Sequence, residues 1–392
     1  MTIHRSLILM LVLLLALQDV LPAGIPVDTA KQMEMVQHLQ TDLPCIKLSG
    51  YVDVGYVYNF IGGGSTVSTQ GYSTDLNARG DFNVNAVKLT LEKPLTCESV
   101  LQAGFRGDLM VGEDCTGFSG DASGASSIYL QQAYAIVRLP VGKELDIKAG
   151  KFVSMMGYEA DERPTNLNIT QGVNAKLDPH PSPGLMLQYP ALDCLTLPAG
   201  VINGAVGDTN NGLDTSNDGY AFIGGFGLKN KEQTAELQFN LHWAPWGDPG
   251  FGANAPVSNQ ENQNVLGLNL WADWRPKCCN DKLMLALNSS YWRGMNYTSE
   301  AGSPVSGDST FWTVAAYAKY KFTPLFSLAG RAEYAHSNDD QLLGLVPNTP
   351  GFALPSSDDA WSWTLTAGFD LTENLLLRAE YRIDFGDDVV LK

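Results

Sequence analysis

IKLSGYVDVGYVYNF, residues 46–60, alternates between two kinds of side chain. One face of an extended strand would carry Ile46, Leu48, Gly50, Val52, Val54, Tyr56, Tyr58 and Phe60. The opposite face would carry Lys47, Ser49, Tyr51, Asp53, Gly55, Val57 and Asn59. Because the apolar face ends in aromatic residues, the pattern favours a strand that crosses a membrane, with lipid on one side and water on the other.

The same alternation recurs along the chain in segments of about ten residues, the length that spans a bilayer as a tilted strand. The predicted strands are Ile46–Phe60, Phe82–Glu92, Ser99–Val111, Ile128–Leu139, Leu145–Phe152, Gly184–Tyr189, Leu195–Asn203, Tyr220–Leu228, Ala235–Trp243, Asn264–Trp274, Lys282–Trp292, Phe311–Phe322, Phe326–His336, Trp361–Leu371 and Leu375–Phe385. Long loops, such as residues 61–81, alternate with short turns, such as Lys93–Glu98. The sequence therefore predicts an all-β fold, a transmembrane antiparallel up-and-down β-barrel of about 14–16 strands with short periplasmic turns and long extracellular loops.

Aromatic residues gather at the ends of these strands. Those next to long loops include Tyr56, Tyr58, Phe60, Trp243, Tyr291, Trp292, Phe311, Trp312, Tyr334, Trp361, Trp363 and Phe385. Those next to short turns include Trp274, Tyr320, Phe322, Phe326 and Phe369. Aromatic residues favour strands in general, but their concentration at both ends indicates two girdles at the membrane interfaces.

The N-terminus indicates export. His4 and Arg5 precede an apolar run, Ser6–Leu17, which is too short to span a bilayer. We interpret residues 1–23 as a signal peptide, 24–44 as a periplasmic N-terminal segment and 45–392 as the barrel. Asp28–Leu39 has helical spacing and is either a short helix or a flexible remnant of the leader. The expected location is the outer membrane of a Gram-negative-type bacterium.

Several short motifs follow one another in a fixed order. They are Gly50-Tyr51-Val52-Asp53-Val54-Gly55-Tyr56 with Asn59-Phe60, Gln131-Gln132-Ala133-Tyr134, Ala149-Gly150-Lys151-Phe152, Gly157-Tyr158-Glu159 with Asn166, and Arg378-Ala379-Glu380-Tyr381-Arg382-Ile383-Asp384. From about residue 46 to 385 the chain resembles the OmpL-like β-barrel porins. The resemblance implies passive diffusion of solutes across an outer membrane and brings no catalytic residues. The chain departs from such barrels at its end, where Val390-Leu391-Lys392 replaces a terminal aromatic residue.

Charged residues occupy the face opposite the apolar one. A charge that faced lipid near the bilayer midplane would cost a few kcal/mol, so these side chains are expected to face a wet lumen. The pore-lining candidates are Asp53, Lys88, Arg106, Asp108, Arg138, Lys148, Glu236, Lys319, Arg331, Glu333, Arg378, Glu380 and Arg382. In the alternative, opposite charges pair across neighbouring strands and only fill the barrel interior.

The net charge of −17 comes largely from acidic long loops. Such loops predict an electronegative outer mouth that concentrates cations, although acidic loops also serve solubility or bridge divalent ions. The third long loop, Val153–Pro183, holds the constriction candidates Glu159, Asp161 and Glu162. We expect this loop to fold inward and to set its acids opposite Lys88, Arg106 and Lys148. In the alternative, the loop lies outside the mouth and these bases pair with Glu92, Asp108 and Asp146.

Motifs for metal binding and catalysis are weak. Cys278–Cys279 lacks the spaced partners of a zinc site, and Gly207–Gly219 lacks the ligand spacing and final glutamate of an EF-hand. No GxSxG or HExxH sequence occurs. The six cysteines of an exported chain permit disulfides, but structural or free thiols are the preferred interpretation. The sequence predicts no metal, no cofactor and no enzymatic activity.

The preferred function is a porin through which small hydrophilic solutes and ions diffuse passively. The alternatives are a solute-selective channel, for example for sugars, and a narrow or plugged barrel with a structural or adhesive role at the cell surface. The expected partners are outer-membrane lipid and small hydrophilic solutes and ions, without nucleic acid. A homo-oligomer such as a trimer remains open.

The number of predicted strands is odd. Because strand one runs outward, the fifteenth strand, Leu375–Phe385, would also run outward, whereas single-chain bacterial barrels have an even number of strands. Either the weak strands between Gly184 and Leu228 are miscounted or a closing strand is missing. The absent terminal aromatic residue favours the second explanation, which predicts weakened pairing between Leu375–Phe385 and Ile46–Phe60.

Overall fold

The computed structural model describes residues 39–40, 46–58, 80–115, 127–179, 181–203, 220–246, 264–295, 309–337, 359–386 and 390–391. The predicted signal peptide and most of the long-loop residues lie outside these described residues, as does the predicted helix Asp28–Leu39 except for its last residue. Leu39 itself belongs to a short strand, β1 (Leu39–Gln40).

Fifteen long antiparallel strands form the wall of the molecule. They are β2 (Lys47–Val57), β3 (Asp81–Lys93), β4 (Gln102–Val111), β5 (Ile128–Leu139), β6 (Leu145–Phe152), β7 (Ser182–Leu192), β8 (Leu195–Asn203), β9 (Tyr220–Lys229), β10 (Ala235–Trp246), β11 (Asn264–Trp274), β12 (Leu283–Met295), β13 (Ser309–Lys321), β14 (Phe326–Ser337), β15 (Asp359–Thr372) and β16 (Leu375–Gly386). All fifteen predicted strands are confirmed, including the weak ones between Gly184 and Leu228. No helix among the described residues is long and apolar enough to cross a membrane.

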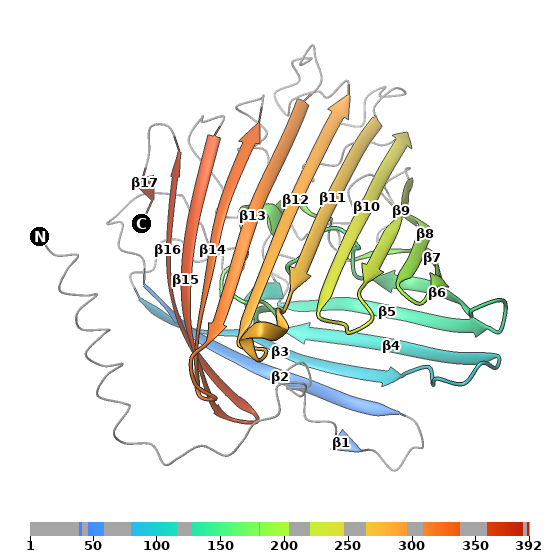
Figure 1. Cartoon of the computed structure of the whole chain (residues 1–392), viewed down its shortest axis with the longest axis horizontal. Helices are drawn as coiled ribbons and strands as arrows, with labels where there is room; N and C mark the ends of the chain where they lie inside the picture. The colour runs from blue at the N-terminus through green and yellow to red at the C-terminus, as the bar shows by residue number, and fades with distance from the viewer. Residues whose placement is uncertain are drawn as a thin grey trace, which may run out of the picture.

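Each long strand pairs with the next one in the sequence, so the sheet is a simple up-and-down meander. Figure 1 shows how the sheet curves, with β9–β16 in one wall and β2–β5 crossing behind them at a steep angle. Strand tilt of this kind is what closes a sheet into a barrel. The fold is therefore the predicted transmembrane β-barrel.

The seam between the first and last long strands is made by short strands. β1 forms two register pairs with β2, Leu39↔Leu48 and Gln40↔Lys47. β17 (Val390–Leu391) forms two register pairs with β16, Asp384↔Leu391 and Phe385↔Val390, and lies between β16 and β2 in the sheet order. Elsewhere, neighbouring strands pair along most of their length, so the seam has the weakened pairing that the odd strand count predicts.

The two faces of the wall differ in polarity. Leu89 and Leu365 are 54% and 48% exposed on the outer face, whereas their neighbours Lys88 and Thr364 are 3% and 4% exposed toward the interior. This alternation is the arrangement expected when lipid covers one face and the lumen the other.

Aromatic contacts follow both rims of the outer face. Trp312, Tyr334, Trp361 and Phe385 make successive contacts at the long-loop ends of β13–β16, with ring centroids 5.1, 4.6 and 6.4 Å apart. Tyr320, Phe322, Phe326 and Phe369 do the same at the short-turn ends, with centroids 4.8, 5.6 and 5.2 Å apart. These contacts match the two predicted girdles, but the prediction is wrong for Trp292 and Phe311, which are buried in the interior cluster.

Candidate functional site: the inner loop and the lumen wall

The segment between β6 and β7, residues 153–181, folds into the barrel interior and is called the inner loop here. It contains a 3₁₀ turn, Arg163–Thr165, and one short helix, α3 (Val173–Leu177). Pro164 suits the start of the 3₁₀ turn because its fixed φ matches that conformation. Gly157 has φ +88°, a conformation that side chains disfavour, and so permits a sharp bend after Met156.

β14 binds the inner loop through Arg331. The guanidinium of Arg331 donates to a carboxylate oxygen of Glu159 at 2.7 Å and also lies 2.8 Å from Glu333. Arg331 donates further to the carbonyl oxygen of Thr170 at 2.6 Å. All three charged side chains are almost completely buried. Ion pairs buried to this degree are rigid, because leaving either partner alone would cost several kcal/mol.

β16 binds the backbone of the same loop. Glu380 accepts hydrogen bonds from the backbone N–H and the hydroxyl of Thr170, at 2.9 and 2.6 Å. Arg378 donates to the carbonyl oxygen of Arg163 at 2.9 Å, and Arg382 donates to the carbonyl oxygen of Gln171 at 2.6 Å. Three predicted lumen residues on one strand therefore bind loop atoms.

The loop is also held by β3, which is separated from β16 in the sheet order by β17 and β2. Lys88 forms ion pairs with Asp108, at 2.9 Å, and with Glu162 of the loop. Arg163 of the loop forms a buried ion pair with Asp114, with Nε donating to Oδ2 at 2.8 Å. Because the loop leaves the wall between β6 and β7 and binds β14, about halfway round the sheet order, the inner loop crosses the lumen.

α3 and its neighbours pack against β12 and β13. Asn174 accepts a hydrogen bond from the hydroxyl of Thr313, and Asp178 accepts one from Ser290 at 3.1 Å. The ring of Tyr158 lies 5.0 Å from that of Tyr317. Burial is the main cause that raises the pKa of Asp178 to about 7; the hydrogen bond from Ser290 opposes this rise, and the charge of Glu159 adds to it.

The other predicted lumen residues lie on the inner face and bind wall residues. Asp53 accepts a hydrogen bond from Asn85 at 2.9 Å. The ion pairs among them are Arg106–Asp108 at 3.0 Å, Arg138–Asp146 at 2.7 Å and Glu236–Lys229 at 3.2 Å. Lys148 lies over the ring of Tyr134, with Nζ 4.5 Å from the centroid, and Lys319 is partly buried near the short-turn end of β13.

The contacts of the loop acids differ in part from the sequence expectation. Glu162 meets Lys88 as expected, but Glu159 reaches Arg331 on the far wall, and Asp161 is partly buried in the loop. Arg106 and Lys148, expected opposite these acids, instead bind Asp108 and the Tyr134 ring. The expectation failed here because sequence order cannot say which wall a long loop reaches.

Sequence reasoning missed the uncharged half of the site. The amide of Asn168 donates to the hydroxyl of Thr366 at 2.7 Å, and Gln171 and Asn174 are likewise buried against the wall or the loop. A signal was present in residues 166–174, NLNITQGVN. There the amide and hydroxyl side chains Asn166, Asn168 and Thr170 alternate with the apolar Leu167 and Ile169. Such groups are favoured where a backbone turns inside a wet cavity.

The site has the chemistry of a constriction. Among the described residues, no group of three or more His, Cys, Asp or Glu side chains is arranged to hold a metal ion. The cysteines in this part of the chain, Cys97, Cys115, Cys194, Cys278 and Cys279, are all unbonded thiols. What the arrangement places across the lumen is a loop bound by charged, amide and hydroxyl groups.

Solved structures share the barrel fold. The outer membrane channel DcaP of Acinetobacter baumannii matches with a TM-score of 0.54 at 13% identity, over 86% of this chain and 90% of that chain. OprB of Pseudomonas putida matches with a TM-score of 0.53 at 14% identity, over 91% and 90%. An anion-selective porin from Comamonas acidovorans matches with a TM-score of 0.53 at 11% identity, over 88% and 89%.

Sequence comparison places the chain in a family. No curated protein matches it. A family model described as "Putative beta-barrel porin-2, OmpL-like" matches residues 45–391, nearly the whole chain. This match confirms the resemblance carried by the motifs at Gly50–Tyr56 and Arg378–Asp384. With its barrel, its polar lumen and this match together, the chain belongs to the family of OmpL-like β-barrel porins of the outer membrane.

Proposed function

We propose that solutes cross this porin by diffusion through a lumen that the inner loop narrows, so that only small hydrophilic solutes and ions pass. The observation that carries the proposal is that the loop leaves the wall between β6 and β7 and is bound by β3 and β14, through Lys88–Glu162 and Arg331–Glu159. A segment held at two sides cannot swing out of the lumen without breaking buried ion pairs, which is costly. The role is that of a channel and not of an enzyme.

The loop contacts also bear on ion selectivity. Glu159 and Glu162 are in direct contact with wall bases, which offset part of the field that these two acids would set across the passage. The acidic long-loop residues expected at the outer mouth lie mostly outside the described residues. We propose that this mouth sets a mild preference for cations, which weakens as salt screens it.

Single-channel recording in planar bilayers tests the proposal. The wild-type protein should show a small, stable unit conductance in KCl and a reversal potential of cation-preferring sign in a salt gradient. The double variant Glu159→Gln/Glu162→Gln removes the ion pairs that join the loop to β14 and β3 and should raise the unit conductance or make it fluctuate. Lys143→Gln is the matched control, because it removes an exposed ion pair with Asp193 in a turn far from the loop.

Three outcomes would change the conclusion. An unchanged, steady conductance in the double variant would mean that these two ion pairs do not hold the constriction in place. A barrel that conducts no ions at all would favour the plugged alternative, with a structural or adhesive role. A channel that saturates with sugars would favour the sugar-selective alternative.

Delivery and assembly are part of the same proposal. We propose that residues 1–23 are removed during export, which N-terminal sequencing of the mature protein checks. OmpT of Vibrio cholerae, which shares the fold with a TM-score of 0.51 at 9% identity, has been solved in a trimer form. A trimer of this chain would be seen as a species of three times the barrel mass by native mass spectrometry.

A further inference from the structure

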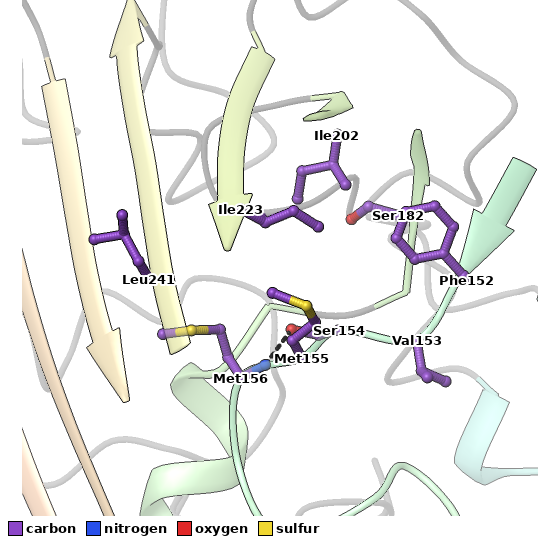
Figure 2. A pocket seen from close by; sticks show the side chains of 9 residues that line it. All are labelled: Phe152, Val153, Ser154, Met155, Met156, Ser182, Ile202, Ile223 and Leu241. Carbon is purple, nitrogen blue, oxygen red and sulfur yellow. Dashed lines mark hydrogen bonds between the residues drawn. The ribbon is translucent and has the colours of Figure 1, made fainter. Parts of the chain in front are cut away.

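The inner loop leaves little room for a ligand where it meets the ends of β6–β10. The pocket between Met155, Met156 and Ile223 has free space for about one water molecule (Figure 2). Its apolar lining belongs to a cluster that continues along the wall through Val265 and Trp292, so it packs the loop against the strands. Thiol groups that solvent reaches lie at the short turns instead.

Most of the described cysteines lie in short turns, on the periplasmic side of the barrel. Cys97 follows β3, Cys194 lies between β7 and β8, and the pair Cys278 and Cys279 lies between β11 and β12. The thiols of Cys97, Cys194 and Cys278 are exposed and that of Cys279 is partly exposed, whereas Cys115, after β4, is buried. Solutes of the periplasm therefore have access to the turn cysteines.

Cys278 and Cys279 differ from the other cysteines because their sulfur atoms are in contact. The two Sγ atoms lie 3.4 Å apart. Both residues belong to a 3₁₀ turn, Lys277–Cys279, which Figure 1 shows at the lower ends of β11 and β12. The backbone N–H of Cys279 donates to the carbonyl oxygen of Pro276 at 3.1 Å, and that of Lys282 donates to the carbonyl oxygen of Cys279 at 3.0 Å. These hydrogen bonds fix the backbone on both sides of the pair.

A disulfide within this pair is disfavoured by the short distance between the two residues. Consecutive Cα atoms lie about 3.8 Å apart across a trans peptide, whereas disulfides usually join Cα atoms that are about 4.4–6.8 Å apart. A disulfide outside this range is strained and easier to reduce. The two residues are unbonded thiols in the structure, and their sulfurs are free to bond to a third atom.

The distance between the sulfurs of Cys278 and Cys279 matches a chelate with one ion. Two sulfurs bonded to the same ion at about 2.3 Å each lie about 3.3 Å apart when the bonds meet at a right angle, and about 3.8 Å apart at the tetrahedral angle. The observed 3.4 Å lies within this range. Among the described residues no third His, Cys, Asp or Glu completes a closed metal site. The pair therefore differs from a structural zinc site and suits a soft ion that needs two sulfurs only.

We propose that Cys278 and Cys279 chelate a soft, thiophilic ion at the periplasmic rim of the barrel, and that trivalent arsenic fits the pair best. Trivalent arsenic forms bonds that meet at little more than a right angle, so sulfurs 3.4 Å apart bind it without movement of the backbone. With an arsenical of the type R–As=O, both S–H groups give their protons to the oxygen, which leaves as water while two As–S bonds form. No oxidant or reductant takes part. The site lies in a turn that connects two strands, so the inference does not depend on the proposed function.

A pair of adjacent thiols binds such an arsenical far more tightly than separate thiols do. Once the first As–S bond has formed, the second sulfur is already within reach, and its high effective concentration raises affinity by about 10²–10⁴-fold. Cys97 and Cys194 lie in different turns, and neither has a cysteine beside it in the sequence. Phenylarsine oxide should therefore bind at one site per chain.

Mass spectrometry of the reduced full-length barrel in detergent micelles tests the site, with phenylarsine oxide as the probe. One equivalent should add a single arsenical to the wild type and lower the number of thiols that react with an aromatic disulfide reagent by two. Cys278→Ser and Cys279→Ser should each weaken binding at least about hundredfold, because only one sulfur is left. The matched control is Cys97→Ser/Cys194→Ser, which removes two other exposed thiols and should bind as tightly as the wild type.

Several results would overturn the proposal. They are tight binding that survives either single serine substitution, binding that the control variant loses, and a wild-type protein isolated with the two cysteines joined to each other. Folding of each variant is checked by the heat-dependent gel mobility of the barrel. A barrel that does not conduct KCl contradicts the proposed function alone, whereas a conducting barrel that binds no arsenical at the pair contradicts only this inference.

Discussion

In the inner loop, burial of Asp178 disfavours the ionised form of its carboxyl group. Its carboxyl group is buried against β12, where Ser290 donates to one oxygen. Because its pKa in the folded protein, about 7, lies above the value of 3.8 in the unfolded chain, the folded state holds the proton more tightly. The resulting stabilisation is fully present below about pH 4 and is lost as the pH rises through 7.

The first prediction concerns the pH dependence of loop docking. In the wild type, docking should weaken by a few kcal/mol between pH 4 and pH 8, and the channel current should fluctuate more at pH 8 than at pH 5. Asp178→Asn keeps the acceptor for Ser290 and removes the charge, so its current should be steady over the same range. Identical pH profiles for the wild type and the variant would show that Asp178 does not govern docking.

The inner loop also needs a residue without a Cβ atom at Gly157. It has φ +88°, and a Cβ atom there would lie 2.2 Å from Oδ2 of Asp178. Gly157→Ala should therefore strain the backbone and displace Asp178, which increases cleavage of the loop by a protease added from either side. Gly107→Ala on β4 is the control, because a Cβ atom there meets no atom within 4 Å. Equal protease resistance in both variants would contradict the role given to Gly157.

At the scale of elements, Thr366 on β15 links the inner loop to the wall. Its hydroxyl accepts from the amide of Asn168 at 2.7 Å and donates to Glu380 at 2.6 Å. Thr366→Val has nearly the same shape but leaves both partners short of a hydrogen bond, a loss of about 1–3 kcal/mol. We expect faster hydrogen exchange of the loop amides near Asn168. Thr372→Val, at the last residue of β15, should leave these amides unchanged, and slow exchange in both variants would contradict the link.

All fifteen strands could be predicted from the sequence, most with bounds within a few residues. Each strand is encoded locally, because adjacent side chains face lipid and water in turn. Ile128–Leu139 and Asn264–Trp274 begin and end at the predicted residues. The inner loop could not be predicted in the same way. Glu159 pairs with Arg331, 172 positions away in the sequence, and no local pattern encodes such a contact.

For the predicted lumen residues, the sequence predicts which face of the sheet each side chain lies on, but it does not predict the contact partner. Alternation places Lys88, Arg331 and Glu380 on the inner face, because side-chain direction follows from strand period alone. Which of them binds the wall and which binds the loop depends on the path of the loop across the lumen. Lys148 shows this well, since only the three-dimensional structure reveals that Asp146 is already held by Arg138.

At the scale of the whole molecule, the barrel has one weak line along its wall. Fifteen long strands pair in sequence order, but among the described residues the two-residue strand β17 is what lies between the last of them, β16, and the first, β2, while the two-residue strand β1 pairs with β2. Closure removes exposed strand edges, which would otherwise leave backbone N–H and C=O groups unpaired in lipid. The seam should therefore be where the barrel opens first.

Hydrogen exchange measured by mass spectrometry on the barrel in detergent tests this expectation. Amides of β2 and β16 should exchange at least about tenfold faster than those of β12 and β13, which pair with long strands on both sides. Replacing Val390 and Leu391 by proline removes two N–H donors of β17. That change should speed exchange at Asp384 and Phe385 while leaving β12 unaffected. If β2 and β16 are instead as protected as β12, contacts outside the described residues hold the seam as firmly as the rest of the wall.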